Sequence, residues 1–345
     1  MTFRKAIQRI HLWLGFTSGA LLIAVAFTGC ILAFEDELRY ATQHELLYVE
    51  AENKPSLNVE QLQAALREFD PKLKLNQIRF YGDPEMATQC YTRDKKIIAV
   101  NPYTGKILGV RDTSKDWLSV ILSFHRTLLL GKTGETIILC NVCIFLAMLL
   151  SGIVLWMPPL LKQWKHNLSL KRNLPPKRRN YEWHRMFGLY AWLPLFLIAI
   201  TGISMAWGSE KKEKLKSLFA ANPPTGNIYD QVASQVHHQE PIDVLRVTFP
   251  KDSSDVVSIS VRYETLGFRK QSSFSFDQYS GKLLKTELYQ EKSFGQRFFG
   301  SNYEIHTGRI FGVPGKIIMF LAGLIALSLP ITGFLIWKGK RNRAS

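Results

Sequence analysis

Four long stretches of this chain contain no charged side chain. They are Leu12–Phe34, Thr136–Leu161, Met186–Ser209 and Ile317–Trp337. Each is longer than the roughly 18 apolar residues that indicate a membrane-spanning helix, and a helix of about 20 residues crosses a hydrocarbon core of about 30 Å. Buried helices of a soluble protein would not be expected to repeat this pattern four times. The sequence therefore predicts an integral membrane protein with four transmembrane helices.

The net charge of +16 is concentrated beside these stretches. The flanking cations are Arg4, Lys5 and Arg9; Lys162, Lys165, Lys171, Arg172, Lys177, Arg178 and Arg179; and Lys338, Lys340, Arg341 and Arg343. By the positive-inside rule, both termini and the loop between the second and third helices are expected in the cytoplasm. The polar segments 35–116 and 210–300 are then expected outside. Because the cations flank helices instead of covering one folded face, a nucleic-acid partner is not expected.

The chain contains two copies of one unit, and this repeat is its main organising feature. The first stretch reads HLWLGF…FTGCILAF and the third reads HRMFGLY…ITGISMAW, so that His11 and His184 each precede a Thr-Gly pair by 17 positions. The second and fourth read HRTLLLGKTGE…SGIVLW and HTGRIFGVPGK…TGFLIW, and His125 and His306 each precede a glycine by 27 positions. The repeat predicts two tandem helical hairpins.

The polar segments between the arms of each hairpin also repeat. In the first segment we expect a helix at 57–69, strands at 75–81, 87–92 and 96–101, and a turn at 101–108. In the second we expect a helix at 227–238, strands at 243–249, 255–262 and 269–276, and a turn at 276–284. The turns place Gly105 and Gly281 where a positive φ is expected. Each segment is therefore predicted to be a small αβββ module of the extracytoplasmic space.

These expectations define the fold class as an α-helical membrane protein in which two tandem hairpins each carry an inserted extracytoplasmic αβββ module. The predicted divisions are a first transmembrane helix at 1–34, a periplasmic module at 35–116, an interfacial helix and second transmembrane helix at 117–161, a basic cytoplasmic loop at 162–183, a third transmembrane helix at 184–209, a second periplasmic module at 210–300, and an interfacial segment, fourth transmembrane helix and basic tail at 301–345.

Four of the eight histidines occupy corresponding positions in the repeat. Ionisable groups near membrane depth are costly and tend to be functional. Proton handling would need only one histidine, whereas symmetric pairs suit metal ligation, and imidazoles from facing helices are known haem ligands. Two residues can bind one iron only at a shared depth. We therefore predict an inner haem held by His11 and His184 and an outer haem held by His125 and His306.

Other residues near these histidines are predicted to assist them. Arg126 and Arg185 directly follow predicted ligands, and either could pair with haem propionates or serve as an interfacial anchor. Recurring glycines are expected to let a macrocycle or a neighbouring helix approach closely; they are Gly15, Gly29, Gly152, Gly188, Gly202 and Gly333. The four histidines outside the repeat are expected to be surface residues; they are His44, His166, His237 and His238.

The four cysteines do not predict a disulfide framework. Cys30, Cys140 and Cys143 fall inside predicted membrane helices, and only Cys90 lies in a polar segment. Cys140 and Cys143 form a CxxC string, but at lipid depth we expect them to be packing residues instead of a redox pair.

Several motifs together resemble the PepSY-associated transmembrane helix proteins over nearly the whole chain. The motifs are IHLWLGF at 10–16, NPYTGKILG at 101–109, HRTLLLG at 125–131, SGIVLW at 151–156, WHRMFGLY at 183–190 and TGFLIW at 332–337. The resemblance implies an iron-regulated protein of the bacterial inner membrane, similar to ferric-siderophore reductases with two b-type haems. Some relatives are fused to flavin reductase domains, which implies electron input from the cytoplasm. This chain has no Gly-rich dinucleotide fingerprint, so a separate donor is expected.

The leading hypothesis is a di-haem electron conduit that passes electrons from a cytoplasmic donor to a periplasmic acceptor, a ferric siderophore. Reduction would loosen the chelate because ferrous iron matches hard oxygen ligands less well. One alternative is a non-redox protein whose modules bind peptides or regulate a peptidase. Another is a transporter that uses the repeat as a gating pair, although no charged residue lies at the middle of any predicted helix to serve as a coupling site.

Overall fold

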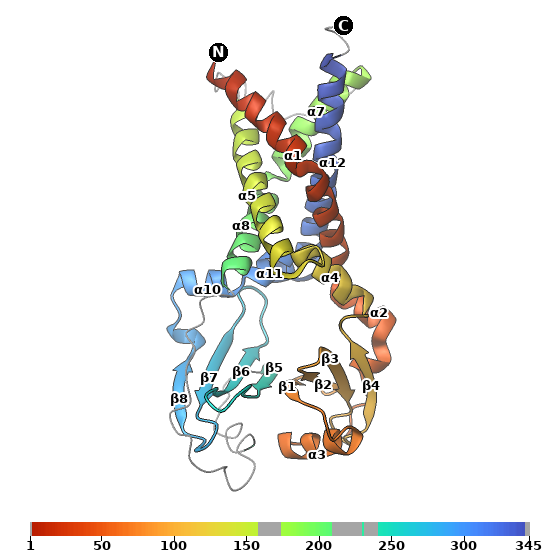
Figure 1. Ribbon diagram of the computed structural model, residues 1–345, viewed down its shortest axis with the longest axis vertical. Helices are drawn as coiled ribbons and strands as arrows, with labels where there is room; N and C mark the ends of the chain where they lie inside the picture. The colour runs from red at the N-terminus through yellow and green to blue at the C-terminus, as the bar shows by residue number, and fades with distance from the viewer. Residues whose placement is uncertain (1, 158–173, 209–229, 231–240, 342–345) are drawn as a thin grey trace. The chain divides into compact units, whose positions relative to one another are not determined.

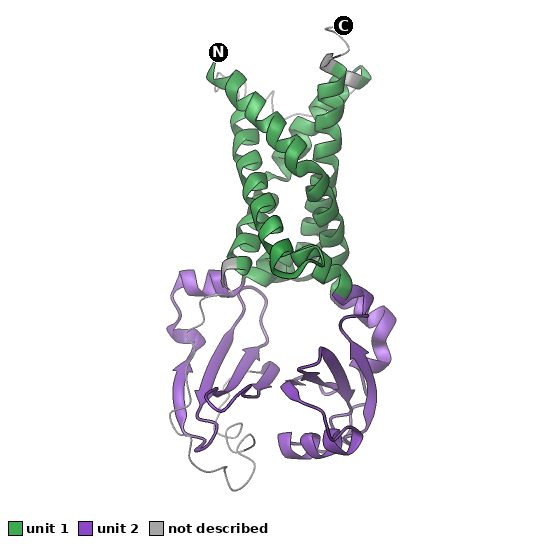
Figure 2. Cartoon of the chain, viewed as in Figure 1, with its two compact units in different colours: residues 1–35, 120–210, 302–345 green, residues 36–119, 211–301 purple. Residues whose placement is uncertain are grey.

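The computed structural model forms two compact units, which we call the helical unit and the sheet unit (Figures 1 and 2). The structure describes residues 2–157, 174–208, 230 and 241–341. The helical unit comprises residues 1–35, 120–210 and 302–345, and the sheet unit comprises 36–119 and 211–301. Each unit therefore takes segments from both copies of the repeat.

The helical unit contains the apolar helices. Its main elements are α1 (Phe3–Leu32), α5 (Gly131–Trp156), α7 (Pro176–Tyr190), α8 (Trp192–Gly208) and α12 (Gly312–Arg341), with α11 (Asn302–Thr307), η3 (Arg309–Phe311) and most of α4 (Trp117–Thr127) beside them. Among the described residues, three helices are long and apolar enough to span a membrane, and a bent pair makes a fourth span if counted as one. The structure thus supports a membrane protein with three to four spanning helices.

The third predicted helix is not continuous, which corrects the expectation of one unbroken span. Its two parts, Arg178–Tyr190 and Trp192–Ala206, are bent by 59° at a short break. Pro194 explains the position of the break. A proline has no N–H to donate to the carbonyl four residues earlier, here that of Tyr190, and its ring clashes with that carbonyl.

The arms of the two hairpins pack around one apolar core. α1 packs against α5 and α12, α5 packs against α8, and α12 packs against α7 and α8. The buried core residues are Leu22, Phe145, Leu149, Ala191, Leu195, Ala199, Ala322 and Ala326. Four of the eight are alanines, and small side chains let helices in a membrane approach closely. Large apolar side chains such as Leu150, Ile318 and Leu321 are exposed, as expected for a surface that lipid covers.

The sheet unit is one eight-stranded antiparallel sheet with the order β4-β3-β2-β1-β5-β6-β7-β8. The strands are β1 (Leu75–Tyr81), β2 (Thr88–Thr92), β3 (Lys96–Val100), β4 (Ile107–Asp112), β5 (Ile242–Thr248), β6 (Val257–Tyr263), β7 (Gln271–Phe276) and β8 (Leu283–Glu287). Its helices are α2 (Glu35–Leu47), α3 (Val59–Phe69), α10 (Phe294–Gly300) and the short η2 (Tyr289–Glu291). The predicted strands are present, and the glycines of both turns have positive φ as predicted, 74° at Gly105 and 68° at Gly281.

Two features of this sheet differ from the prediction of two separate αβββ modules. Each module has a fourth strand, because β4 and β8 begin within the predicted turns 101–108 and 276–284. The modules also share one sheet, since β1 and β5 pair antiparallel. The predicted helix 227–238 lies outside the described residues except for Asp230, whose carboxylate accepts hydrogen bonds from the first backbone N–H groups of α3.

Helix α3 covers one face of the sheet and creates its core. Asn58 and Gln61 form a reciprocal capping box at its N-terminus, which satisfies backbone donors that the first helical turn leaves free. The helix then buries Leu62 and Leu66 against a cluster of strand residues; these include Ile78, Cys90, Ile98, Val247, Ile259 and Phe276. The opposite face of the central strands is polar.

Asp116, just before α4, provides a test of the sheet unit. Its carboxylate accepts hydrogen bonds from Ser119, from Gln43 and from the guanidinium of Arg39 at 3.0 Å. Burial alone would raise the pKa of Asp116, but these donors hold that pKa at about 2. Because this is below the unfolded value of about 3.9, the carboxylate stabilises the fold at neutral pH by roughly 2 kcal/mol, and this contribution is lost as pH falls from about 4 towards 2.

We therefore expect Asp116→Asn to lower the thermal unfolding midpoint at pH 7 and to flatten its dependence on pH below about 4. Thermal unfolding of the purified protein in detergent, followed by circular dichroism across this pH range, measures both effects. An Asp116→Asn protein that unfolds at the wild-type temperature at pH 7 would contradict the assignment.

Candidate functional site

The structure brings together the two histidines of each predicted pair. The ring centres of His11 on α1 and His184 on α7 are 6.4 Å apart, with ring planes at 88°. Those of His125 on α4 and His306 on α11 are 6.3 Å apart, with planes at 75°. Each pair joins one histidine from each copy of the repeat, so neither hairpin contains a complete pair.

These separations match the spacing of two imidazoles on one metal ion. An imidazole nitrogen binds a transition metal at about 2.0–2.1 Å and lies about 1.1 Å from its ring centre, so two rings on opposite sides of one ion have centres about 6.3 Å apart. Both observed distances agree with this value. Each pair therefore has the ring spacing that ligation of one ion by both imidazoles would need.

Hydrogen bonds fix the protonation of the first pair. His11 Nδ1 lies 2.8 Å from Ser151 Oγ, and His184 Nδ1 lies 2.8 Å from Thr332 Oγ1. Each hydroxyl donates its own hydrogen to a helix carbonyl, 3.0 Å away for Ser151 and 2.9 Å away for Thr332. The hydroxyl oxygens must then accept from the rings. Nδ1 consequently carries the proton in both histidines, and Nε2 keeps a free lone pair.

The second pair follows the same arrangement. His125 Nδ1 lies 3.0 Å from Thr28 Oγ1 and 3.0 Å from the carbonyl oxygen of Val25 on α1. His306 Nδ1 lies 3.1 Å from Thr201 Oγ1 and 3.0 Å from the carbonyl oxygen of Ile198 on α8. A carbonyl only accepts, so Nδ1 donates and Nε2 is again the ligand nitrogen. Such partners of the second nitrogen orient metal-binding histidines and raise their basicity.

A glycine lies beneath every one of these rings. A Cβ added to Gly29 would lie 3.1 Å from Cε1 of His125, and one added to Gly202 would lie 3.4 Å from Cε1 of His306. The corresponding distance is 3.5 Å both at Gly152 beside His11 and at Gly333 beside His184. These four glycines therefore accommodate an imidazole directly, where the sequence predicted contact with a macrocycle or a helix. The remaining two, Gly15 and Gly188, instead face the side chains of Met148 and Leu329.

The hydroxyl and the glycine are adjacent residues in all four cases, a role that was not among the expectations from the sequence. We call each Ser-Gly or Thr-Gly dipeptide a seat; the seats are Thr28-Gly29, Ser151-Gly152, Thr201-Gly202 and Thr332-Gly333. Within each hairpin, the histidine of one arm rests on the seat of the other arm. The signal was visible in the sequence, since such a dipeptide occurs in each of the four charge-free stretches.

The two pairs lie near opposite ends of the helical unit. On α1, His11 belongs to the first pair, whereas the Thr28-Gly29 seat holds the second, and 17 residues of helix correspond to about 26 Å. In the second arm of the same hairpin the order is reversed: His125 of the second pair comes first, on α4, and the Ser151-Gly152 seat of the first pair follows, on α5. The helical unit therefore holds one imidazole pair near each of its two ends.

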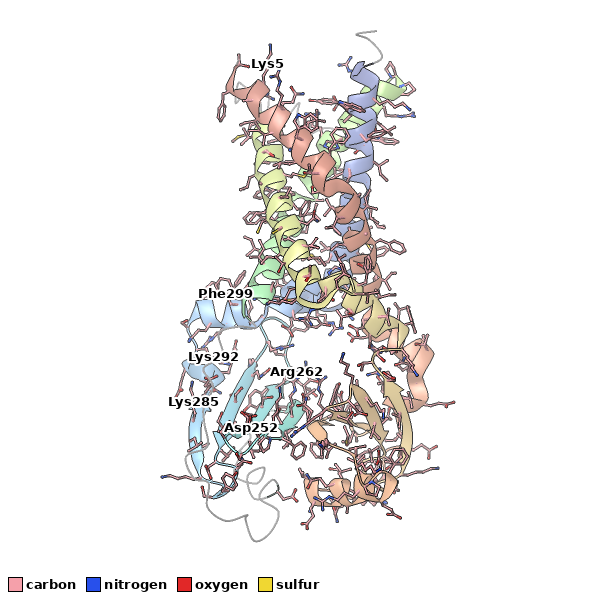
Figure 3. The ribbon with its side chains drawn as sticks, in the orientation of Figure 1. Lys5, Asp252, Arg262, Lys285, Lys292 and Phe299 are labelled. Atoms are coloured by element: carbon pink, nitrogen blue, oxygen red, sulfur yellow. The ribbon has the colours of Figure 1, made fainter. Side chains whose placement is uncertain are left out.

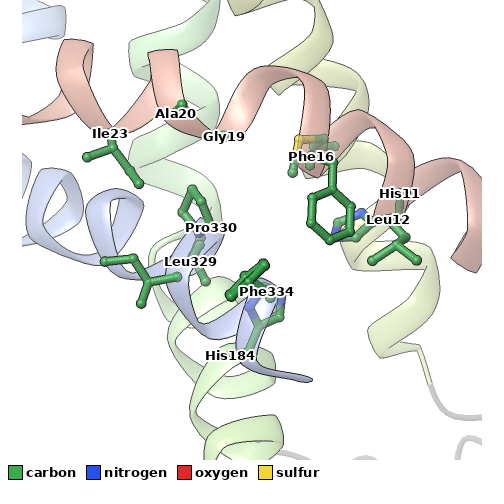
Figure 4. A pocket seen from close by; sticks show the side chains of 14 residues that line it. His11, Leu12, Phe16, Gly19, Ala20, Ile23, His184, Leu329, Pro330 and Phe334 are labelled. Carbon is green, nitrogen blue, oxygen red and sulfur yellow. The ribbon is translucent and has the colours of Figure 1, made fainter. Parts of the chain in front are cut away.

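An apolar cavity of about 350 Å³ adjoins the first pair (Figure 4). It lies chiefly between α1 and α12, and its lining on α1 runs from His11 to Ile23. Phe16, Leu329 and Phe334 are among the apolar residues that face it, and its lining contains no Asp, Glu, Lys or Arg. A cavity of this size and character suits a flat apolar group with a few fixed polar contacts. The imidazole pair beside it suits a haem better than a bare ion.

The remaining ligand chemistry of the described residues agrees with that preference. No group of three or more His, Cys, Asp or Glu side chains in the described parts of the chain could hold a metal ion. Structural zinc sites use four protein ligands and catalytic ones three. A haem, by contrast, brings four nitrogens of its own and needs only axial ligands from the protein. The first pair, with its apolar cavity, therefore fits a haem, and the second pair shares the ring spacing and the hydrogen-bond pattern of the first.

The predicted propionate partners differ in their surroundings. Arg185 donates to Glu182 at 2.6 Å, and both side chains are largely buried. Arg126 is exposed. Their role towards propionates stays a prediction. Of the other histidines, His44 stacks on Tyr48 with ring centres 5.0 Å apart, and His166, His237 and His238 lie outside the described residues.

Comparison with known proteins adds one finding. A protein-family model described as the PepSY-associated TM region matches residues 8–340, which is nearly the whole chain. The match includes both histidine pairs, all four seats and both polar segments. No curated protein matches the chain.

The seats give a direct test of the site. We expect Gly29→Val to displace His125, because even the added Cβ would lie 3.1 Å from the ring and the branches would extend into its place. Bound haem, measured as pyridine haemochrome, should fall from about two per chain to about one. Gly188→Val is the matched control, since its nearest neighbour is the flexible end of Leu329 at 3.6 Å. Equal haem content in the two variants would argue against the seat.

Proposed function

The chain belongs to the PepSY-associated transmembrane family, and we propose that it carries electrons across a bacterial inner membrane through two b-type haems. In this proposal a cytoplasmic donor supplies the electrons, and a ferric siderophore in the periplasm receives them. The observation that carries the proposal is the spacing of the imidazole pairs, whose ring centres lie 6.4 Å and 6.3 Å apart, close to the value of about 6.3 Å expected for two imidazoles that share one ion.

The histidines would hold the haems through Nε2. When bound, a haem would supply one-electron iron chemistry, and two imidazole ligands from the protein would suit it to electron transfer. The hydroxyls of the four seats keep each ring in the tautomer that exposes Nε2 and restrict its rotation. Fixed ligands of this kind reduce the structural change that accompanies a change in charge.

The surroundings of the first pair support one-electron transfer over acid-base chemistry. The cavity lining beside His11 and His184 is apolar, so it offers few polar partners to water or to a charged ligand. The protein side chains around this pair bring no net charge to the cavity. In such surroundings the haem's potential would be set chiefly by the two imidazoles and their hydrogen bonds.

The direction of transfer follows from the basic segments. Cations flank both termini and the loop at 162–183, which by the positive-inside rule supports a cytoplasmic position for the end that contains His11 and His184. Electrons would enter there from a separate reductase and leave near His125 and His306. Reduction of a ferric siderophore would weaken its hold on iron, since hard oxygen ligands bind the ferrous ion less tightly.

The non-redox alternative assigns the sheet unit a role in binding peptides or regulating a peptidase. It accounts for the polar segments but gives no function to four histidines with matching seats. The transporter alternative likewise lacks a use for histidines that lie together in pairs. Electron transfer is therefore the function that we favour.

The absorption spectrum of the protein, purified in detergent from haem-sufficient cells, is the primary test. We expect a Soret band, and α and β bands that appear on reduction, with about two haems per chain. His11→Ala and His184→Ala should each remove the same haem, and His125→Ala and His306→Ala the other, so either double variant within a pair should resemble its single variants. A colourless wild-type protein would refute the proposal, and crossed loss between the pairs would refute the pairing.

Electron delivery to a siderophore is a separate expectation. Protein reduced with dithionite and freed of excess reductant should be reoxidised by a ferric siderophore, with release of ferrous iron that a ferrous-specific chelator traps. The His125→Ala protein should retain the haem of the other pair yet reoxidise at least about tenfold more slowly, because its route to the acceptor is lost. His44→Ala is the control. Reoxidation of His125→Ala at the wild-type rate would contradict the assigned route.

A further inference from the structure

The polar face of the sheet carries a cluster of three arginines, which we call the arginine cluster: Arg79, Arg246 and Arg262. Arg79 on β1 lies directly opposite Arg246 on β5 in the antiparallel register. Arg262 lies on the next strand, β6 (Figure 3). The residues that alternate with them, such as Ile78 and Val247, are fully buried on the face that α3 covers. The cluster therefore lies on the opposite face, where the two modules join.

Two arginines opposite each other on neighbouring strands oppose stability, because like charges in this position repel. The structure holds them together through Gln77, whose amide oxygen accepts from Arg79 Nε at 2.9 Å and from Arg246 Nε at 2.8 Å. Arg79 also stacks on the ring of Tyr91 at 4.2 Å. Arg79 also hydrogen-bonds to the Tyr81 hydroxyl. The Nε atoms of both arginines are occupied by Gln77, so the guanidinium edge of Arg246 and the remaining donor of Arg79 are the groups left to bind an anion.

The charge of the cluster is not balanced on its own face. Among the described strands β1, β2, β5, β6 and β7, the sole acidic residue is Asp243, and it pairs with Arg262 at 2.5 Å. Burial, followed by the neighbouring arginine cations, lowers the pKa of Arg246 to about 10. The surrounding face consists mainly of neutral hydroxyl groups; they include Thr248, Ser258, Ser260, Ser273 and Ser275. Positive charge thus accumulates among groups that donate and accept hydrogen bonds.

We propose that Arg79 and Arg246, assisted by Arg262, bind an anion through its oxygen atoms, and that this anion is the ferric chelate reduced by the protein. A guanidinium fork matches carboxylates in geometry as well as charge. The acceptor would accordingly be a chelate of net negative charge with carboxylate groups, as in a ferric citrate complex. The assignment of the anion as electron acceptor rests on the proposed function, whereas the anion site rests on the cluster alone.

Calorimetric titration with gallium(III) citrate, a redox-inert stand-in for ferric citrate, tests the site. The protein is the full chain in neutral detergent without added anionic lipid. We expect binding to wild type, and affinity lowered about tenfold or more in Arg79→Gln and in Arg246→Gln. Arg246→Lys should retain part of the affinity, since it keeps the charge but loses the fork. Lys106→Gln removes an exposed charge elsewhere in the sheet unit and should bind as wild type does.

Thermal unfolding separates loss of the site from loss of the fold. Gallium citrate should raise the unfolding midpoint of wild type but not that of Arg246→Gln. Without ligand, Arg246→Gln should unfold at or above the wild-type midpoint, because it removes the repulsion from Arg79. An Arg246→Gln protein that unfolds well below wild type would show that the arginine is structural and would overturn the proposal.

The remaining outcomes distinguish this inference from the proposed function. Equal binding of gallium citrate by wild type and the arginine variants overturns the anion site, even if the protein reduces ferric chelates. Variants that lose only the response to vesicles of anionic phospholipid would overturn it as well, by assigning the cluster to lipid headgroups. Arginine-dependent binding by a protein without haem would leave the anion site standing, while both the proposed function and the acceptor assignment would fall.

Discussion

The contact between an imidazole and a Ser-Gly or Thr-Gly seat is the interaction on which the helical unit depends. It has two parts that act together. The glycine gives the ring space against the neighbouring helix, and the hydroxyl fixes the proton on Nδ1. A Cβ added at Gly29 would lie within 3.1 Å of the His125 ring, and at the other three glycines it would already touch the ring at 3.4–3.5 Å. Without the hydroxyl, either nitrogen could carry the proton. Four repetitions of one contact thus determine helix spacing and ligand chemistry at once, as expected where second-nitrogen partners orient metal ligands.

Much of the site could be predicted from the sequence because the repeat is a strong constraint. The equal spacing from His11 and His184 to their Thr-Gly pairs put both residues at one depth, and the structure places their rings together. What spacing could not provide was the partner of each ring, since the seat of His11 is Ser151, 140 residues away. The Pro194 break had a local cause but was masked by the uninterrupted apolar character of its segment.

Two features of the sheet could not be predicted from the sequence pattern: the strands β4 and β8, and the pairing of β1 with β5. Strand-like runs of residues located six strands, but β4 and β8 follow glycine turns and contain no buried residue, so their pattern is weak. The pairing of β1 with β5 joins residues more than 150 positions apart. No local propensity encodes such a contact; it depends on two edge strands meeting and satisfying each other's free backbone groups. The arginine cluster exists only because of this junction, which is why neither module alone would suggest it.

In both units, each copy of the repeat contributes one half of a paired feature. In the helical unit the feature is a histidine pair, and in the sheet unit it is the pairing of β1 with β5. One hairpin supplies His11 and His125, and the other supplies His184 and His306. A lone hairpin would therefore present two unpaired imidazoles at the two ends of its helices, and its sheet module would leave the β1 edge open. A second copy completes both pairs and closes the edge at the same time. Fusion of two copies in one chain makes that completing partner permanent, and the cost of bringing the halves together no longer depends on protein concentration. The repeat is accordingly the condition for the candidate site as well as a description of the fold.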